Sequence, residues 1–369
     1  MTVDEILAAA EQGDIIEQAD LAGMDFSGRD LSAVVFSKCN LGSANFSGAK
    51  VIGTAFQDCD LSGANFNDCN LFKSIWSGFK AFGASFRGAN LGQFAATDTD
   101  VSGADFSGAD LSDSVWTKCR LERAGFSGSR LTRAAFTSSN LKGVNWAGLH
   151  LERIMAIECE MEGANLAQAN VDRATFMKCS MAGITLNKAR LHRTLIRDAS
   201  LPNQDFSGSE FYGVQAGGAD FSGCNFENAQ IGLSNFMGAN LGKANLRGAT
   251  GKGSVFMEAN LAAADFSHAR LVYASFGNAD LTDANLTHLS CRQSGFEKAK
   301  AVRTNFRGAD LTDCNLANML VENADFSGAH LFRTQLHGIE NKDAITDAAR
   351  IVSYSGDDED RLKAENWLA

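Results

Sequence analysis

Nine cysteines and six histidines are the residues of this chain whose types could carry metal or redox chemistry. Thiolates and imidazole nitrogens bind structural zinc at short, characteristic spacings. The histidines show no such spacing to cysteines or carboxylates; they are His150, His192, His268, His288, His330 and His337. The many Ser-Gly and Gly-Ala pairs recur along the whole chain and form no nucleotide-binding motif. We therefore expect no catalytic residue, no metal site and no cofactor.

A large apolar residue recurs at almost every fifth position from Leu21 to Leu336, beginning Leu21, Phe26, Leu31, Phe36. We call these positions centres. A period of five matches neither the 3.6 of a helix nor the 2 of a strand, so it indicates an internal repeat in which the chain turns at every unit. A smaller apolar residue, mostly Ala or Cys, lies two positions before each centre and also points inward.

Turn-forming residues fill the rest of each unit. Asn or Asp usually precedes the centre and Ser-Gly often follows it, as in Phe106-Ser107-Gly108. Asn and Asp bond to their own backbone and Gly accepts positive φ, so a corner every five residues costs little. Units such as Ala109-Asp110-Leu111 and Ala239-Asn240-Leu241 resemble the pentapeptide-repeat family. The resemblance implies an all-β solenoid, a right-handed quadrilateral β-helix with four units per coil and about 16 coils.

The order of the centres supports four units per coil. Leu alternates with Phe or Trp from 21 to 151, so aromatic residues face aromatic residues across a square section. Where a centre is small, bulk has moved two positions: Phe79 precedes Ala81 and Phe94 precedes Ala96, which conserves core volume. Gly251 and Ala301 have no such compensation and predict a local void or kink nearby.

Three segments follow from this period. Residues 1–18 break it; Thr2 can cap a helix and Gly13 can end one, so we expect an N-terminal capping helix. Residues 19–340 form the pentapeptide-repeat β-helix. Residues 341–369 are expected to be helical, over Asn341–Val352 and again over Asp357–Leu368, as a C-terminal cap or dimerisation tail. Leu362, Trp367 and Leu368 offer its apolar side and could support a homodimer.

All nine cysteines share the inward frame: Cys291 is a centre, and the others take the smaller inward position. These are Cys39, Cys59, Cys69, Cys119, Cys159, Cys179, Cys224 and Cys314. They behave as small core residues, although Cys39 and Cys59 lie one coil apart, close enough for a disulfide. No signal peptide or transmembrane run is apparent, so we expect free thiols and a cytoplasmic location.

The net charge is −11, yet residues 101–200 carry more basic than acidic side chains. Residues twenty apart stack on one side of the coil, and a column of arginines forms there: Arg133, Arg153, Arg173 and Arg193. The same side adds Arg130, His150, Arg190 and His192. Stacked arginines repel one another, which requires either neutralisation by Glu152 and Asp172 or an anionic partner surface. Outward aromatics flank the column at Phe72 and Tyr212, and a basic centre with aromatic flanks is a hypothesis for a protein interface.

Function follows from these surfaces. A solenoid without inserted loops offers no cleft for a substrate, so we expect a non-enzymatic scaffold or adaptor that binds a protein partner. We expect no direct nucleic-acid binding and no membrane association. The layout of the chain, a pentapeptide-repeat segment with a short N-terminal helix, is similar to that of family members found beside bacterial type VI secretion components. The alternative that the family implies is imitation of DNA, with binding to gyrase and protection from quinolones or toxins; the overall acidity permits this, whereas the basic middle does not favour it.

Overall fold

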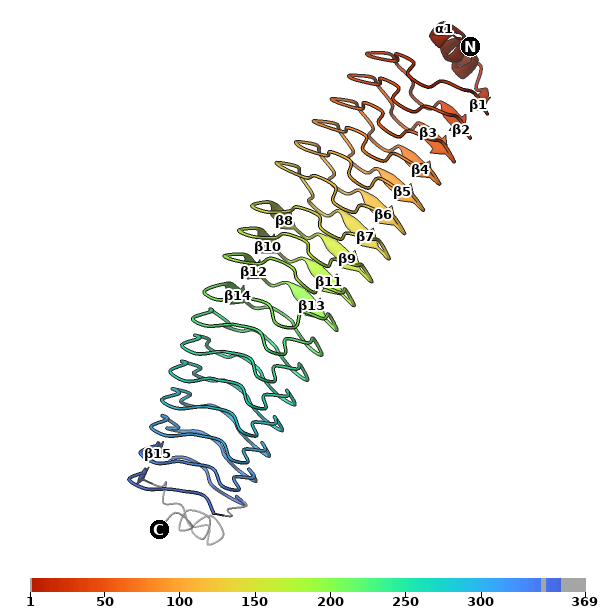
Figure 1. The fold of residues 1–369 in the computed structure, drawn as a ribbon. Helices are drawn as coiled ribbons and strands as arrows, with labels where there is room; N and C mark the ends of the chain where they lie inside the picture. The colour runs from red at the N-terminus through yellow and green to blue at the C-terminus, as the bar shows by residue number, and fades with distance from the viewer. Residues whose placement is uncertain (1, 340–342, 353–369) are drawn as a thin grey trace. The chain divides into compact units, whose positions relative to one another are not determined.

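The computed structural model describes residues 2–339 and 343–352. The chain divides into two compact units, Met1–Thr185 and Leu186–Ala369, which we describe separately. Both are built from very short parallel strands stacked one coil apart (Figure 1). The predicted β-solenoid is confirmed.

The first unit begins with α1 (Val3–Glu11), within the segment expected to be helical. The Glu5 amide donates to Thr2 Oγ1 at 3.3 Å and the Thr2 amide donates to Glu5 Oε2 at 2.7 Å, which is a reciprocal helix cap. Ile6 is fully buried, and α1 contacts β1. The helix thus covers the open end of the first coil.

One side of the first unit carries a regular parallel sheet, in the order β1-β2-β3-β4-β5-β6-β7-β9-β11. Its strands are β1 (Ile15–Glu17), β2 (Val35–Ser37), β3 (Ala55–Gln57), β4 (Ile75–Ser77), β5 (Ala95–Thr97), β6 (Val115–Thr117), β7 (Ala135–Thr137), β9 (Met155–Ile157) and β11 (Thr175–Met177). An adjacent side carries β8 (His150–Glu152) and β10 (Asn170–Asp172), also parallel. Every pair is in register at a step of twenty residues, such as Phe36 with Phe56.

The second unit contains β12 (Arg190–His192), β13 (Leu195–Arg197), β14 (Glu210–Tyr212), β15 (His330–Phe332) and β16 (Arg350–Val352). Isolated parallel bridges at the same step join the coils between them, such as Asn240 with Asn260. Four units per coil is therefore confirmed. Regular strands mark fewer coils than the 16 expected from repeat length, because many coils meet only through single bridges.

The helix expected over Asn341–Val352 is wrong for the part that the structure describes. Ile345 bridges to Asp325, and β16 pairs in parallel with β15, so the solenoid continues to Val352. Polar residues at the expected centres Asn341 and Thr346 concealed this continuation in the sequence. The second expected helix, with Leu362, Trp367 and Leu368, lies outside the described residues.

The corners form as the residue types predict. The Asp25 side chain accepts a hydrogen bond from the Ser27 amide at 3.1 Å, and Asn40 does the same for Gly42 at 3.2 Å. The second residue after each centre has positive φ, +65° at Gly28 for example. Along the β1–β11 sheet, Ile, Val, Ala, Met or Thr replaces the Asn or Asp. The Ile, Val, Ala and Met side chains have no oxygen to accept that bond, and the backbone there stays extended.

The core is a set of stacked side chains. Phe26, Phe46 and Phe66 stack along one side at centroid distances of 4.9 and 4.6 Å. Phe26 meets Phe36 of the opposite side edge to face at 6.4 Å, which confirms the expected pairing of aromatic sides. Phe79 and Phe94 are both buried and lie 5.1 and 5.2 Å from Trp76, so they fill the space beside Ala81 and Ala96.

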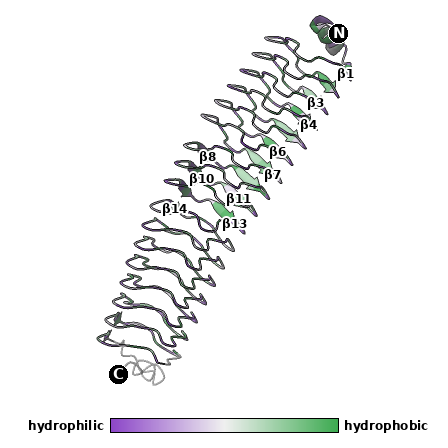
Figure 2. Ribbon diagram, viewed as in Figure 1, coloured by the Kyte–Doolittle hydropathy of each residue, from purple (hydrophilic) through white to green (hydrophobic). Residues whose placement is uncertain are grey.

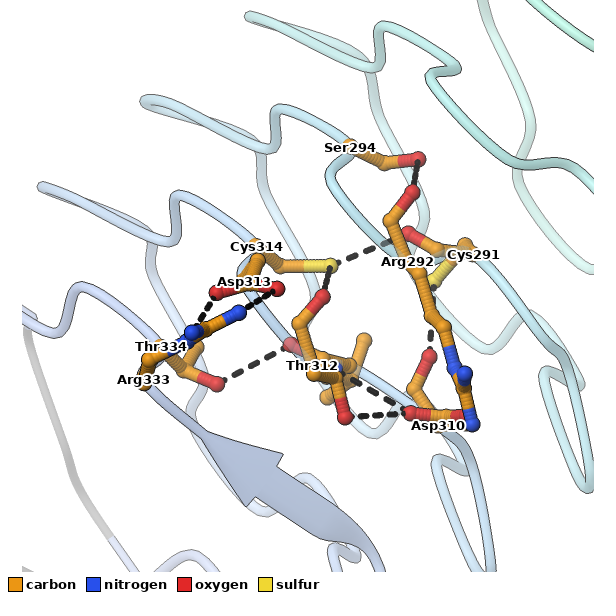
Figure 3. A network of polar contacts seen from close by, with 10 residues as sticks. Cys291, Arg292, Ser294, Asp310, Thr312, Asp313, Cys314, Arg333 and Thr334 are labelled. Carbon is orange, nitrogen blue, oxygen red and sulfur yellow. Dashed lines mark hydrogen bonds and ion pairs between the residues drawn. The ribbon is translucent and has the colours of Figure 1, made fainter. Parts of the chain in front are cut away.

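The cysteines occupy this core as predicted, since all nine are free and buried. Burial raises the pKa of the Cys69 and Cys224 thiols to about 12, so both are protonated at neutral pH. The Cys314 thiol donates to the carbonyl oxygen of Cys291 at 3.0 Å (Figure 3). Such thiols act as small side chains with one hydrogen bond.

Candidate protein-interaction surface

The predicted basic column lies on the side of the coil that carries β8 and β10 in the first unit. We call this side the β8 side. Arg133, Arg153 and Arg173 follow its centres at successive coils, each with positive φ, of 58°, 53° and 52°. Their amides take part in the ladder between coils, as when Arg153 donates to the Asp172 carbonyl at 2.8 Å. The fold therefore places these three guanidinium groups at one corner, each in an exposed position.

An acidic residue that sequence reasoning missed neutralises the first of them. Arg133 makes two parallel hydrogen bonds to the Asp113 carboxylate, at 2.5 and 2.6 Å. The Arg133 guanidinium holds the pKa of Asp113 below its usual range, and Asp113 raises the pKa of Arg133. Arg130 is similarly paired with Asp110 at 3.5 Å. Each acid lies twenty residues before its arginine, and that spacing was the available signal.

The remaining groups of the β8 side differ in their pairing. Arg173 lies 3.9 Å from Asp172, and His150 lies 3.9 Å from Glu152 and 3.1 Å from the Asn170 amide nitrogen. Arg153 is exposed and has no ion pair within 4 Å among residues 2–339 and 343–352. The column is thus compensated at Arg133, weakly paired at Arg173 and open at Arg153.

Phe72 is less available than the sequence suggested. It is half-buried because its ring leans over Gly92 of the next coil, where an added Cβ would lie 3.2 Å from Phe72 Cδ2. The ammonium of Lys73 lies 5.2 Å from the centre of the same ring. Phe72 therefore offers a partner protein only one edge of its ring, with the Lys73 ammonium beside it.

In the second unit, β12 and β14 bring Arg190, His192 and Tyr212 together. Arg190 and His192 lie 3.4 and 3.3 Å from the carboxylate of Glu210. The His192 and Tyr212 rings meet at a centroid distance of 6.3 Å, and Tyr212 is 48% exposed. Arg193 is exposed beside them, without an ion pair within the described residues.

A surface hollow of about 510 Å³ opens next to Tyr212. Its lining consists of Tyr212, Gln230, Gly232, Leu233, Thr250, Gly251 and Lys252. Leu233 is 52% exposed, and Lys252 points toward the Tyr273 ring at 5.1 Å. The void expected at Gly251 is wrong, because an added Cβ would lie 2.5 Å from Ser254 Oγ and 2.9 Å from Ile231 Cγ1 and the core has no room there. Gly251 only borders the hollow.

Paired arginine and aspartate residues recur in the second unit with the geometry of Arg133 and Asp113. Arg333 contacts Asp313 through two bonds of 2.5 Å (Figure 3), and Arg303 contacts Asp283 at 2.6 and 2.7 Å. We call these pairs Arg-Asp rungs. They fix charged side chains parallel to the surface and reduce the charge presented to a partner.

Neither unit presents an evident metal or membrane element over the described residues. No group of three His, Cys, Asp or Glu side chains there is arranged to hold a metal ion. No helix there is both long and apolar enough to span a bilayer.

Family models described as pentapeptide repeats match most of the chain. One matches segments between residues 16 and 339, among them 16–51, 84–114 and 309–339, and a second matches residues 206–250. The chain belongs to the pentapeptide-repeat family. No curated protein matches it.

Several solved pentapeptide-repeat structures are similar to the chain. One is QnrB1, a plasmid-mediated fluoroquinolone resistance protein, with 20% identity over 46% of this chain and 85% of its own, at a TM-score of 0.28. Another is HetL from the cyanobacterium Nostoc, a pentapeptide-repeat protein involved in heterocyst differentiation regulation. It has 21% identity over 88% of this chain and 96% of its own, at a TM-score of 0.18. A pentapeptide-repeat protein from the Arabidopsis thaliana thylakoid lumen has 33% identity over 34% of this chain and 69% of its own, at a TM-score of 0.15.

Proposed function

We propose that this pentapeptide-repeat protein is a non-enzymatic scaffold that binds a protein partner through its rigid solenoid walls. The observation that carries the proposal is the exposed pair Tyr212 and Leu233 beside a hollow of about 510 Å³. Neither side chain is needed to fill the core. Tyrosine is enriched at protein interfaces because its ring gives contact area at low entropic cost.

Charge in the hollow suggests the chemistry of the partner side chain. Lys252 lines it, and Arg270 follows Thr250 in the next coil, whereas Glu210 is occupied by Arg190 and His192. An apolar side chain next to a carboxylate would therefore fit. On the first unit, the open Arg153 favours an acidic partner surface in the same way.

The test is affinity capture with the tagged full chain, followed by identification and purification of the partner. We expect Tyr212→Ala with Leu233→Asp, and separately Arg153→Glu with Arg173→Glu, to lower affinity by about tenfold or more. Lys243→Glu is the control, since it removes a similar charge from an exposed corner on another side of the second unit. Full binding by both double variants would refute the proposed surfaces.

A second candidate is binding to gyrase by imitation of DNA, which the net charge of −11 favours. The basic residues of the β8 side oppose it, because a DNA-binding saddle is itself basic. Supercoiling assays with and without a quinolone separate the two. Protection of gyrase would support imitation of DNA, and an unchanged quinolone response would exclude it.

A cytoplasmic accessory role beside type VI secretion components is a narrower form of the scaffold proposal. The nine free thiols suit a reducing compartment. Binding to a purified secretion component that Tyr212→Ala weakens would support this role. Binding with an affinity that Tyr212→Ala leaves unchanged would count against it.

A further inference from the structure

The β1–β11 sheet of the first unit has an unusual outer surface. From β2 through β11, none of the residues that these strands point outward is charged. Figure 2 shows hydrophobic colour along several of these strands. Three large apolar side chains are exposed there: Ile75 at 67%, Val115 at 44% and Met155 at 39%. We call this surface the apolar face.

Large and small residues alternate along the apolar face. The first residue of each strand forms one column, and Ile75, Val115 and Met155 protrude at every second coil of it. Ala55, Ala95 and Ala135 lie between them and leave shallow depressions. Two coils span about 9.6 Å, so protrusions and depressions repeat at the same interval.

We propose that the apolar face is the contact between two copies of this chain, packed antiparallel about a two-fold axis that passes between Ala95 and Val115. Reversal about this point places each protrusion over a depression of the partner copy. Ile75 then meets Ala135, Val115 meets Ala95, and Met155 meets Ala55. A two-fold contact requires a surface complementary to itself, and this alternation supplies it.

The size of the face suits a dimer of moderate affinity. About this axis the eight strands from β2 to β11 oppose one another. They extend about 34 Å along the stack, and one side of a coil is about 16 Å wide. The area is thus about 540 Å² per copy, or about 1,100 Å² in total, which is close to the lower limit for specific interfaces. A face this regular that is complementary to its own reverse fits a second copy better than an irregular globular partner.

Charges of both signs alternate along one border of the face. Lys38 lies 3.8 Å from Glu17 and Lys178 lies 3.8 Å from Glu158, so these corners carry their own counter-charges. Reversal about the axis brings Asp98 of one copy toward Lys118 of the other, and Thr97 toward Thr117. The central pairs are therefore attractive or hydrogen-bonding. Farther from the axis, reversal places Lys38 opposite Lys178 and Asp58 opposite Glu158, whose neighbours one coil away carry the opposite charge. The strands of the β8 side and the hollow beside Tyr212 lie outside this contact, whereas Arg133 and Arg153 border it, two residues before Ala135 and Met155. Binding of a partner to the hollow is therefore independent of the dimer.

The test is the mass and sedimentation of the full chain at 1 to 100 µM. We expect a dimer of twice 39.3 kDa that dissociates on dilution. Ile75→Lys with Val115→Lys should weaken it by about a hundredfold or more, because charges would be buried without partners. Phe82→Lys is the control, since Phe82 is similarly exposed at 64% in the same unit but lies on another side of the coil. Circular dichroism establishes that each variant is folded.

A compensating exchange tests the register itself. Ala135→Ile alone should weaken the dimer by opposing Ile75, whereas Ile75→Ala combined with Ala135→Ile should restore it. A monomeric wild-type chain at 100 µM would overturn the proposal. A dimer that survives both lysines, or that Trp367→Glu dissociates while the lysines do not, would overturn it too. Failure of the exchange to restore binding would overturn the register.

Discussion

The buried aromatic stack of the first unit should dominate its stability, and Phe66 tests this. Phe66 is fully buried and stacks between Phe46 at 4.6 Å and Phe86 at 5.0 Å, with interplanar angles of 4° and 3°. Trp76 also approaches its ring at 5.2 Å. Phe66→Ala should therefore lose both the buried ring and two stacked pairs.

The size of the effect follows from these contacts. Removal of a buried phenylalanine ring costs about 3–5 kcal/mol. Each of the two stacked pairs adds about 0.5–1.5 kcal/mol, which places Phe66→Ala at about 4–8 kcal/mol. With a urea dependence of about 3 kcal/mol per M, the midpoint should fall by about 2 M. Phe66→Leu keeps an apolar side chain and should lose only about 1–2 kcal/mol.

Urea unfolding followed by tryptophan fluorescence is a suitable assay, because Trp76, Trp116 and Trp146 are all buried in the first unit. Phe82→Ala is the matched control: it removes the same ring from the same unit, but Phe82 is 64% exposed. The control should change stability by less than about 0.5 kcal/mol. Equal losses at Phe66 and Phe82, or a midpoint unchanged by Phe66→Ala, would refute the reasoning.

Three further outcomes follow. Gly251→Ala should destabilise the second unit by about 1–3 kcal/mol in thermal unfolding, since its Cβ would collide with Ser254 and Ile231, whereas a gain would reveal free space. Arg133 lowers the pKa of Asp113, so this pair should stabilise the fold above the unfolded pKa of about 3.9 and lose that contribution as the pH falls through the folded pKa. Asp113→Asn should therefore flatten the acid side of the plot of unfolding free energy against pH. An unchanged slope would contradict this. The nine buried thiols should react with an aromatic disulfide reagent only in urea, and rapid native labelling would show that they are accessible.

The repeat itself could be predicted from the sequence because burial at one position in five leaves few arrangements of the backbone. The inward cysteines and the opposed aromatic sides followed from the same frame. The solenoid beyond Leu336 did not, since Asn341 and Thr346 are polar at centre positions while the backbone ladder still continues to Ile345 and β16. Backbone hydrogen bonds between coils can extend a solenoid past its last apolar centre.

The candidate surface was only partly predictable. Arg133, Arg153 and Arg173 do share one corner of the first unit, yet the charge there depends on acids one coil away, such as Asp113 paired with Arg133. The exposure of Phe72 depended on the neighbouring Gly92, over which its ring folds. The hollow beside Tyr212 depends on the absence of a side chain at Gly232, one coil away, where an added Cβ would lie 3.5 Å from the Tyr212 ring. These features depend on contacts between coils and are not visible in a single unit.

The constant step of twenty residues between bridged positions also restricts how the gene can change in length. Loss of one five-residue unit, such as 141–145, would rotate all later residues of the first unit by a quarter turn. His150 and Glu152 would then lie on the neighbouring wall. Duplication or loss of a whole coil leaves every residue on its own wall. Wherever a partner binds one wall, the length of the gene should therefore vary between lineages in increments of twenty codons.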